Sequence, residues 1–155
     1  ISYIGKRHSM GESKGVEELE SILHSVSIEN PSVHPLFVTD VSPRLLPSYM
    51  KASDFLVMNY PNTEHYARYM SPLKLFEYMA SGVPIVTPDL PSIREILDES
   101  SAYFFRPNNE ENLVETIKKV LNDEEMVQNK ATNALERVRN YAWGNRARNI
   151  LEFIK

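Results

Sequence analysis

A glutamate at the edge of a predicted helix is the residue of this sequence that is best placed for chemistry. Ser71 is a suitable N-cap and Pro72 suits the first helical position, so we predict a helix over residues 72–80. The helical period puts Glu77 on the face turned toward the rest of the fold, which it shares with Leu73, Phe76 and Ala80. A carboxylate in that position is costly unless something donates hydrogen bonds to it.

That carboxylate suits the sugar of a nucleotide. The two hydroxyls of a ribose can donate to its two oxygens, and the free N–H groups at the start of the same helix point toward a phosphate. A nucleoside diphosphate would satisfy both features. The residues alone leave a second interpretation open, in which Glu77 lies at the solvent edge of the helix and pairs with Lys74, three positions before it.

Several other classes of site are excluded by the sequence. The five glycines form neither the dinucleotide fingerprint nor the Walker loop, and the four histidines form no metalloprotease motif. No serine hydrolase elbow occurs, and the absence of cysteine excludes disulfides, zinc fingers and thiol nucleophiles. A net charge of −4 argues against a nucleic-acid partner. No apolar run reaches the roughly 18 residues of a membrane span.

The elements that must position these residues alternate between strands and helices. Apolar runs predict strands at residues 1–5, 35–39, 55–58, 84–87 and 102–105. Helical spacing predicts helices at residues 16–26, 45–52, 72–80 and 92–97, and a helical tail from residue 110 with breaks near 122–123 and 141–144. This alternation is typical of a single α/β domain, a Rossmann-like parallel sheet with helices on both faces. Such sheets bind ligands at the carboxyl ends of their strands.

The stretch from Ser71 to Val86 resembles a family motif. Its sequence is Ser-Pro-Leu-Lys-Leu-Phe-Glu-Tyr-Met-Ala-Ser-Gly-Val-Pro-Ile-Val, and with residues 89–95 it is similar to the group 1 (family 4) glycosyltransferases. Residues 3–6, residues 46–54 and the aromatic segment at 141–143 extend the resemblance over nearly the whole chain. The resemblance implies the C-terminal nucleotide-binding half of a GT-B fold. We therefore expect residues 1–155 to be a single donor-nucleotide domain, a fragment of a larger two-domain enzyme.

The resemblance also implies roles for residues around the nucleotide. Glu77 matches the glutamate that holds the ribose, and the backbone amide of Leu73, with Ser71 beside it, would meet the diphosphate. Lys74 belongs to the same donor-nucleotide segment. Val41, just past a predicted strand, lies where the family's backbone recognises the base.

Cations are expected to complete the phosphate site. Lys14 matches the lysine that neutralises the phosphates in the family. Lys6 stands where the family usually has arginine, with Arg7 as the alternative for that duty. These side chains would stabilise the charge that develops on the departing nucleoside diphosphate.

The sequence departs from the family pattern in two places. Tyr69 stands where the family often has a first glutamate that touches the donor sugar, and Glu64 is the expected substitute. Glu64 lies in the long connection 60–70, which we expect to be a mobile loop over that sugar. Between the helices at 16–26 and 45–52 there is room for about one strand, where the family usually has two strands and a helix.

The implied function is that of a retaining glycosyltransferase of the hexosyltransferase class. It would transfer a sugar from a UDP-sugar or GDP-sugar to a glycan or lipid-linked acceptor, as in polysaccharide or lipopolysaccharide biosynthesis, with no cofactor and no metal site. The acceptor site would belong to an N-terminal domain, so the isolated domain should lack full activity. We expect a cytoplasmic protein, which could touch the inner face of the membrane only through that other domain. The alternatives are a non-catalytic nucleotide-binding module and a nucleotide-sugar epimerase of similar fold.

Overall fold

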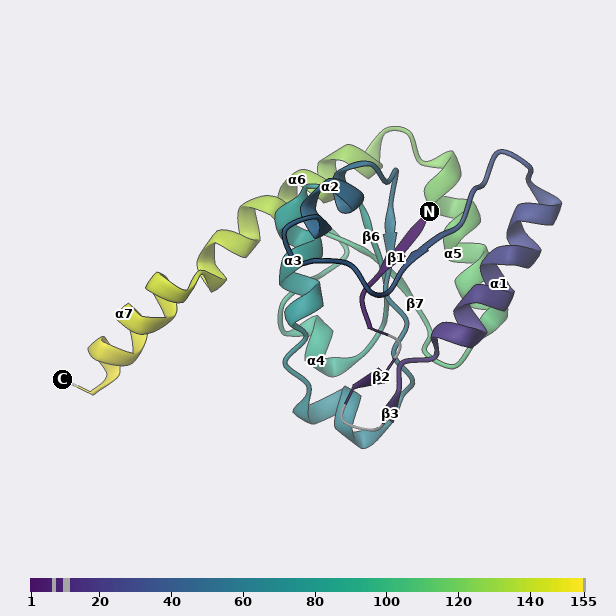
Figure 1. The fold of residues 1–155 in the computed structure, drawn as a ribbon. Helices are drawn as coiled ribbons and strands as arrows, with labels where there is room; N and C mark the ends of the chain where they lie inside the picture. Colours follow the sequence, from purple (N-terminus) through teal and green to yellow (C-terminus); the bar gives the residue numbers. More distant parts are fainter. Residues whose placement is uncertain (7, 10–11, 155) are drawn as a thin grey trace.

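The computed structural model describes residues 1–6, 8–9 and 12–154. These residues form a five-stranded sheet in the order β4-β1-β5-β6-β7, and all its neighbouring strands are parallel (Figure 1). Its strands are β1 (Ser2–Ile4), β4 (Leu36–Val38), β5 (Leu56–Val57), β6 (Ile85–Pro88) and β7 (Tyr103–Phe105). The predicted α/β architecture is confirmed.

Helices cover both faces of this sheet. One face carries α1 (Val16–Glu29) and α5 (Glu110–Asn122). The other carries α2 (Leu46–Lys51), α3 (Leu73–Ser81), α4 (Pro91–Arg94) and α6 (Met126–Val138). Alternate strand residues enter the two cores: Leu56 and Ile85 pack on the α3 side, whereas Val57 and Val86 pack on the α1 side. Both faces of the strands are therefore buried, as their continuous apolar sequences predict.

The strand order reverses at β1, since the chain places β4 on one side of it and β5 on the other. Open parallel sheets bind ligands at the carboxyl edge beside such a reversal. The small antiparallel hairpin of β2 (His8–Ser9) and β3 (Glu12–Ser13) follows β1 at this edge (Figure 1). The carboxyl ends of β1 and β5 are therefore the expected place for a ligand.

The strands β1 and β5 part from each other toward that edge. Among the described residues, Ser2 and Leu56 are the only register pair between them. In a regular ladder the amide of Ile4 would donate to the carbonyl of Val57. It donates instead to the hydroxyl of Tyr78 at 2.8 Å, and that hydroxyl lies 3.1 Å from the Ile4 carbonyl and 3.5 Å from the Val57 carbonyl. The fully buried Tyr78 of α3 thus fills the opening and ties the helix to both strands.

Two segments have structure that the sequence analysis did not predict. The hairpin β2–β3 lies in the polar stretch 6–15, and a π-helical turn (His65–Tyr69) lies in the connection 60–70. Neither segment has the apolar periodicity on which those predictions rested. The mobility of residues 60–70 over a donor sugar stays a prediction.

The start of α3 also differs from its prediction. The helix begins at Leu73, with Pro72 in the N-cap position and no side-chain cap. The predicted roles of Ser71 as N-cap and Pro72 as first helical residue are therefore wrong. The ψ angle of 84° at Pro72 lies outside the helical region, although its carbonyl accepts from the Leu75 amide at 2.8 Å. The helix ends at a glycine C-cap, Gly82, which adopts the left-handed φ of 70°.

The C-terminal helix α7 (Trp143–Phe153) projects away from the sheet and its covering helices (Figure 1). A 3₁₀ turn (Arg139–Tyr141) joins it to α6, near the predicted break. None of the described residues of α7 is buried. No helix in the described part of the chain has the length and apolar character needed to cross a membrane.

Replacement of Tyr78 by phenylalanine tests the junction between β1 and β5. We expect Tyr78→Phe to lower the free energy of unfolding by about 1–3 kcal/mol, because the buried amide of Ile4 loses its acceptor. Chemical denaturation measures the change. The control is Tyr49→Phe, at an exposed tyrosine, which should stay within about 0.5 kcal/mol of the wild type. Equal stabilities of the two variants would mean that the Tyr78 hydroxyl does not hold the strands.

Candidate functional site

Lys74 of α3 carries a buried amino group that forms no hydrogen bond within the described residues. The residue is 9% exposed, and its Nζ has no hydrogen-bond partner among the described residues. That atom lies 3.7 Å from the centre of the Tyr3 ring, and a Cβ on Gly5 would come within 2.6 Å of it. Gly5 therefore leaves the room into which the lysine reaches, at the carboxyl end of β1.

Two other lysines continue this site: Lys14 lies close enough to Lys74 to disturb its protonation, and Lys6 does the same to Lys14. Burial, and then the positive charge of Lys14, lower the pKa of Lys74 from 10.5 to about 6, although Glu77 acts in the opposite direction. Burial and the positive charge of Lys6 likewise lower the pKa of Lys14. The structure thus brings Lys6 and Lys14, which the sequence analysis assigned to phosphate, together with Lys74, which it assigned to the donor-nucleotide segment. We call Lys6, Lys14 and Lys74 the lysine cluster.

The lysine cluster is suited to a multiply charged anion. Like charges at short range destabilise one another, and an anion between them removes that cost. The amino-terminal end of α3, next to Lys74, adds the positive end of a helix dipole. Among the described residues, no group of three or more His, Asp or Glu side chains could hold a metal ion. The positive charge that this part of the chain offers to a phosphate comes from lysines and backbone.

Glu77 lies on the exposed side of α3, which corrects the prediction that it faces the sheet. The helix buries Lys74, Leu75, Tyr78 and Met79, whereas Leu73 is 66% exposed and Ala80 is also exposed. The prediction assumed that a lysine at position 74 would face water. A buried lysine breaks that pattern, as residues at functional sites often do.

Exposure of Glu77 leaves it beside a large cavity. Together with Ser71, Leu73 and Phe76 it lines a space of about 820 Å³ between α3 and α7, whose other wall includes Trp143. Glu77 also acts electrostatically on Lys74, although none of the three lysines of the cluster lines this cavity. The amide of Leu73 donates to the Ser71 carbonyl at 2.9 Å. The backbone N–H that the resemblance assigns to the diphosphate is therefore already hydrogen-bonded within the chain in this structure.

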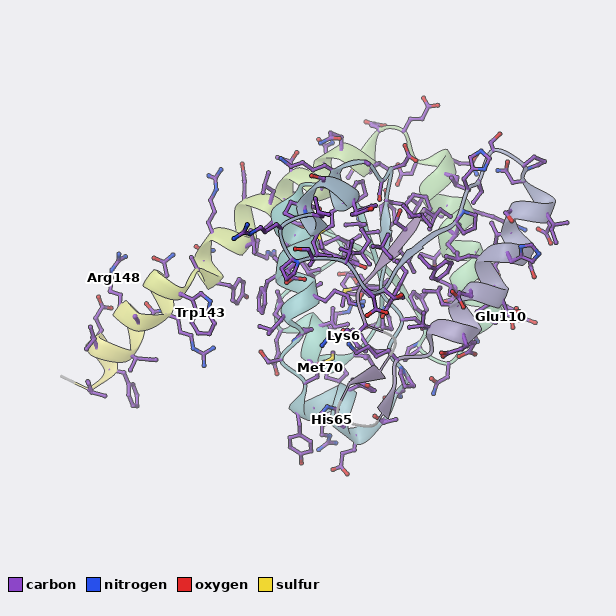
Figure 2. The ribbon with its side chains drawn as sticks, viewed as in Figure 1. Lys6, His65, Met70, Glu110, Trp143 and Arg148 are labelled. Atoms are coloured by element: carbon purple, nitrogen blue, oxygen red, sulfur yellow. The ribbon has the colours of Figure 1, made fainter. Side chains whose placement is uncertain are left out.

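The remaining predicted residues lie near the same edge or outside the described residues. Val41 follows β4 and is partly exposed. Glu64 and the 70% exposed Tyr69 flank and end the π-helical turn. Figure 2 shows Lys6 and His65 toward the end of the molecule that carries β2 and β3. Arg7 lies outside the described residues, and the sugar and base contacts stay predictions.

Sequence reasoning missed two residues that shape the site. Gly5 entered the sequence analysis only as part of the predicted strand 1–5 and of the resemblance at residues 3–6, without a role of its own, although its lack of a side chain admits Lys74. Asn59, which lies two residues past the end of β5, is 8% exposed and donates its amide Nδ2–H to the carbonyl of Gly15 at 2.8 Å. A polar residue immediately after the apolar run 55–58 was the available signal.

The pH dependence of stability tests the state of Lys74. Between pH 6 and 10.5 the unfolded chain holds a proton on Lys74 that the folded protein lacks, so this residue makes stability rise with pH in that window. We expect Lys74→Met to be more stable than the wild type at pH 7. We also expect this variant to lose the part of the rise of stability with pH that Lys74 contributes. Denaturation across the pH range measures both effects, with the exposed Lys118 changed to Met as control. An unchanged slope in Lys74→Met would show that Lys74 stays charged.

Solved structures with a similar fold are glycosyltransferases and related enzymes. Sucrose-phosphate synthase from Thermosynechococcus elongatus matches at 18% identity and TM-score 0.68, over 98% of this chain and 37% of that one. Anabaena Alr3699/HepE in complex with UDP matches at 18% identity and TM-score 0.72, over 98% and 40%. This chain thus spans well under half of either protein. At such identities the likeness shows the fold alone.

A solved structure of comparable length and a family model complete the comparison. The C-terminal domain of LpcC, a glycosyl transferase group 1 family protein from Francisella tularensis, matches at 16% identity and TM-score 0.68, over 90% of this chain and 83% of that one. A comparison with curated proteins finds no match. The model of the family described as "glycosyl transferase-like" matches residues 29–152, which is most of the chain. With a Rossmann-like sheet of the GT-B type and this match, the chain belongs to the glycosyl transferase-like family.

Proposed function

We propose that this chain is the donor-nucleotide domain of a retaining group 1, family 4 glycosyltransferase. It binds a nucleoside diphosphate sugar at the carboxyl ends of β1 and β5. The observation that carries the proposal is the buried Nζ of Lys74, which has no hydrogen-bond partner in the described part of the chain. A buried polar group is stable when a partner satisfies it, and the diphosphate of a sugar nucleotide is such a partner.

The lysine cluster performs the electrostatic part of transfer. When the bond between the anomeric carbon and the β-phosphate oxygen breaks, negative charge grows on the departing diphosphate. Lys14 and Lys74 stabilise that charge most strongly, because they lie in the least hydrated part of the cluster. Cations that are fixed by the fold need little reorganisation during the reaction.

Glu77 takes the ribose in this proposal. Its carboxylate is exposed at the cavity beside α3 and is electrostatically coupled to Lys74, so a ribose there lies next to a diphosphate on the cluster. UDP is the first nucleotide to test, since Anabaena Alr3699/HepE is known in complexes with UDP and with UDP-glucose. The glycan or lipid-linked acceptor would bind to an N-terminal domain. The cytoplasmic location, and contact with a membrane through that domain, belong to the same proposal.

Calorimetry with UDP, GDP and ADP and with the matching nucleosides tests the proposal on the 155-residue chain. We expect Lys14→Ala to weaken UDP binding about tenfold or more and to leave uridine binding unchanged, because a lysine gains its interaction from phosphate charge. Glu77→Ala should weaken both ligands, because both contain the ribose. Lys118→Ala is the control, since Lys118 pairs with Glu29 on the surface at 2.9 Å.

Two results would contradict this function. If the folded wild-type chain binds none of the three nucleotides, it has no donor site. If Lys14→Ala loses equal affinity for UDP and for uridine, Lys14 does not contact the phosphates.

A further inference from the structure

Asn59 forms a hydrogen bond to the segment that contains Lys14. It lies two residues past the end of β5, and its buried amide donates to the carbonyl of Gly15 at 2.8 Å. The same carbonyl accepts the Leu19 amide at 3.0 Å, which is the first hydrogen bond of α1. The side chain of Asn59 thus connects the end of β5 to the point where the chain enters α1.

The backbone around Gly15 is built to receive this side chain. Gly15 is the N-cap of α1 with the left-handed φ of 64°, and a Cβ there would lie only 2.7 Å from Asn59 Nδ2. A residue with a side chain would be strained by that φ angle and would also collide with the amide. The glycine therefore permits the close approach on which the hydrogen bond depends.

Lys14 needs such an anchor because its surroundings oppose its charge. It is partly buried, and Lys6 lies close enough to lower its pKa. It also acts on the buried Lys74 with the same sign of charge. In the absence of an anion these repulsions favour movement of Lys14 toward water. Among the described residues no hydrogen bond or ion pair holds the side chain of Lys14, whereas Asn59 bonds the backbone of the very next residue.

We infer that Asn59 is a positioning residue, which keeps Lys14 in the lysine cluster through the carbonyl of Gly15. The consequence of this role is a diphosphate site that is assembled before the ligand arrives, and that consequence rests on the proposed function. A merely structural asparagine would stabilise the loop and the start of α1 without any specific effect on Lys14. The positioning role therefore predicts that loss of the Asn59 amide changes the pKa of Lys14 and weakens phosphate binding, whereas the structural role predicts neither change.

The first experiment needs no ligand. The pKa of Lys14 is measured by NMR titration of its side-chain resonances in the wild type, in Asn59→Ala and in Asn59→Leu, which keeps most of the volume but cannot donate. We expect the lowered pKa of Lys14 to rise toward 10.5 in both variants, because the side chain moves into water. The exposed Asn62 changed to Ala is the matched control, and Lys118 serves as the internal reference. An unchanged Lys14 pKa in a folded Asn59→Leu protein overturns the inference.

The second experiment connects Asn59 to phosphate through a double-mutant cycle. UDP and uridine affinities are measured for Asn59→Leu, Lys14→Ala and the double variant. We expect Asn59→Leu to weaken UDP binding but not uridine binding, and the double variant to bind UDP about as well as Lys14→Ala alone. Additive losses, or equal losses for UDP and uridine, contradict the positioning role. If the wild type binds no nucleotide while the Lys14 pKa still shifts, the proposed function fails and the positioning role stands.

Discussion

The opening between β1 and β5 is the constraint on which the site depends. Two parallel strands that stayed paired up to their carboxyl ends would leave no space for the hydroxyl of Tyr78. Here the ladder ends after Ser2 and Leu56, and the hydroxyl of Tyr78 satisfies the amide of Ile4 in place of the neighbouring strand. Because Tyr78 is held there, α3 is fixed against the sheet in the orientation that turns Lys74 inward over the Tyr3 ring. The loss of one ladder bond is thus compensated by a side chain that also orients the site.

The electrostatics of the site follow from that orientation. A lysine amino group buried without an acceptor is unfavourable in its charged form, and the neighbouring Lys14 increases the cost. Anion binding removes the cost, so the folding energy of the free chain and its affinity for a phosphate are linked through the same group. The membership of the chain in the glycosyl transferase-like family agrees with a site of this kind.

The parts of the fold that could be predicted are those in which local pattern and burial agree. The helix α1 has its apolar residues at 16, 19, 22, 23 and 26, and all of them are buried as that spacing requires. The buried face of α3 was mispredicted because Lys74 is buried, whereas charged side chains usually face solvent. The same lysine is central to the candidate site. The π-helical turn is held by α4, whose Ser92 hydroxyl donates to the Tyr66 carbonyl at 2.6 Å, and neither this turn nor the β2–β3 hairpin has a local period. The bond between Asn59 and Gly15 joins residues 44 positions apart, which no motif in the sequence indicates.

The most direct measurement of the central claim is the number of protons taken up when UDP binds. Calorimetry near pH 7 in buffers of different ionisation enthalpy gives that number. With a pKa of about 6 in the free protein, Lys74 is mostly neutral at this pH, and a bound diphosphate should restore its charge. The account predicts an uptake of up to about one proton per UDP in the wild type and little or none in Lys74→Met. Binding of UDP with no proton uptake, or with the same uptake in Lys74→Met, would contradict it.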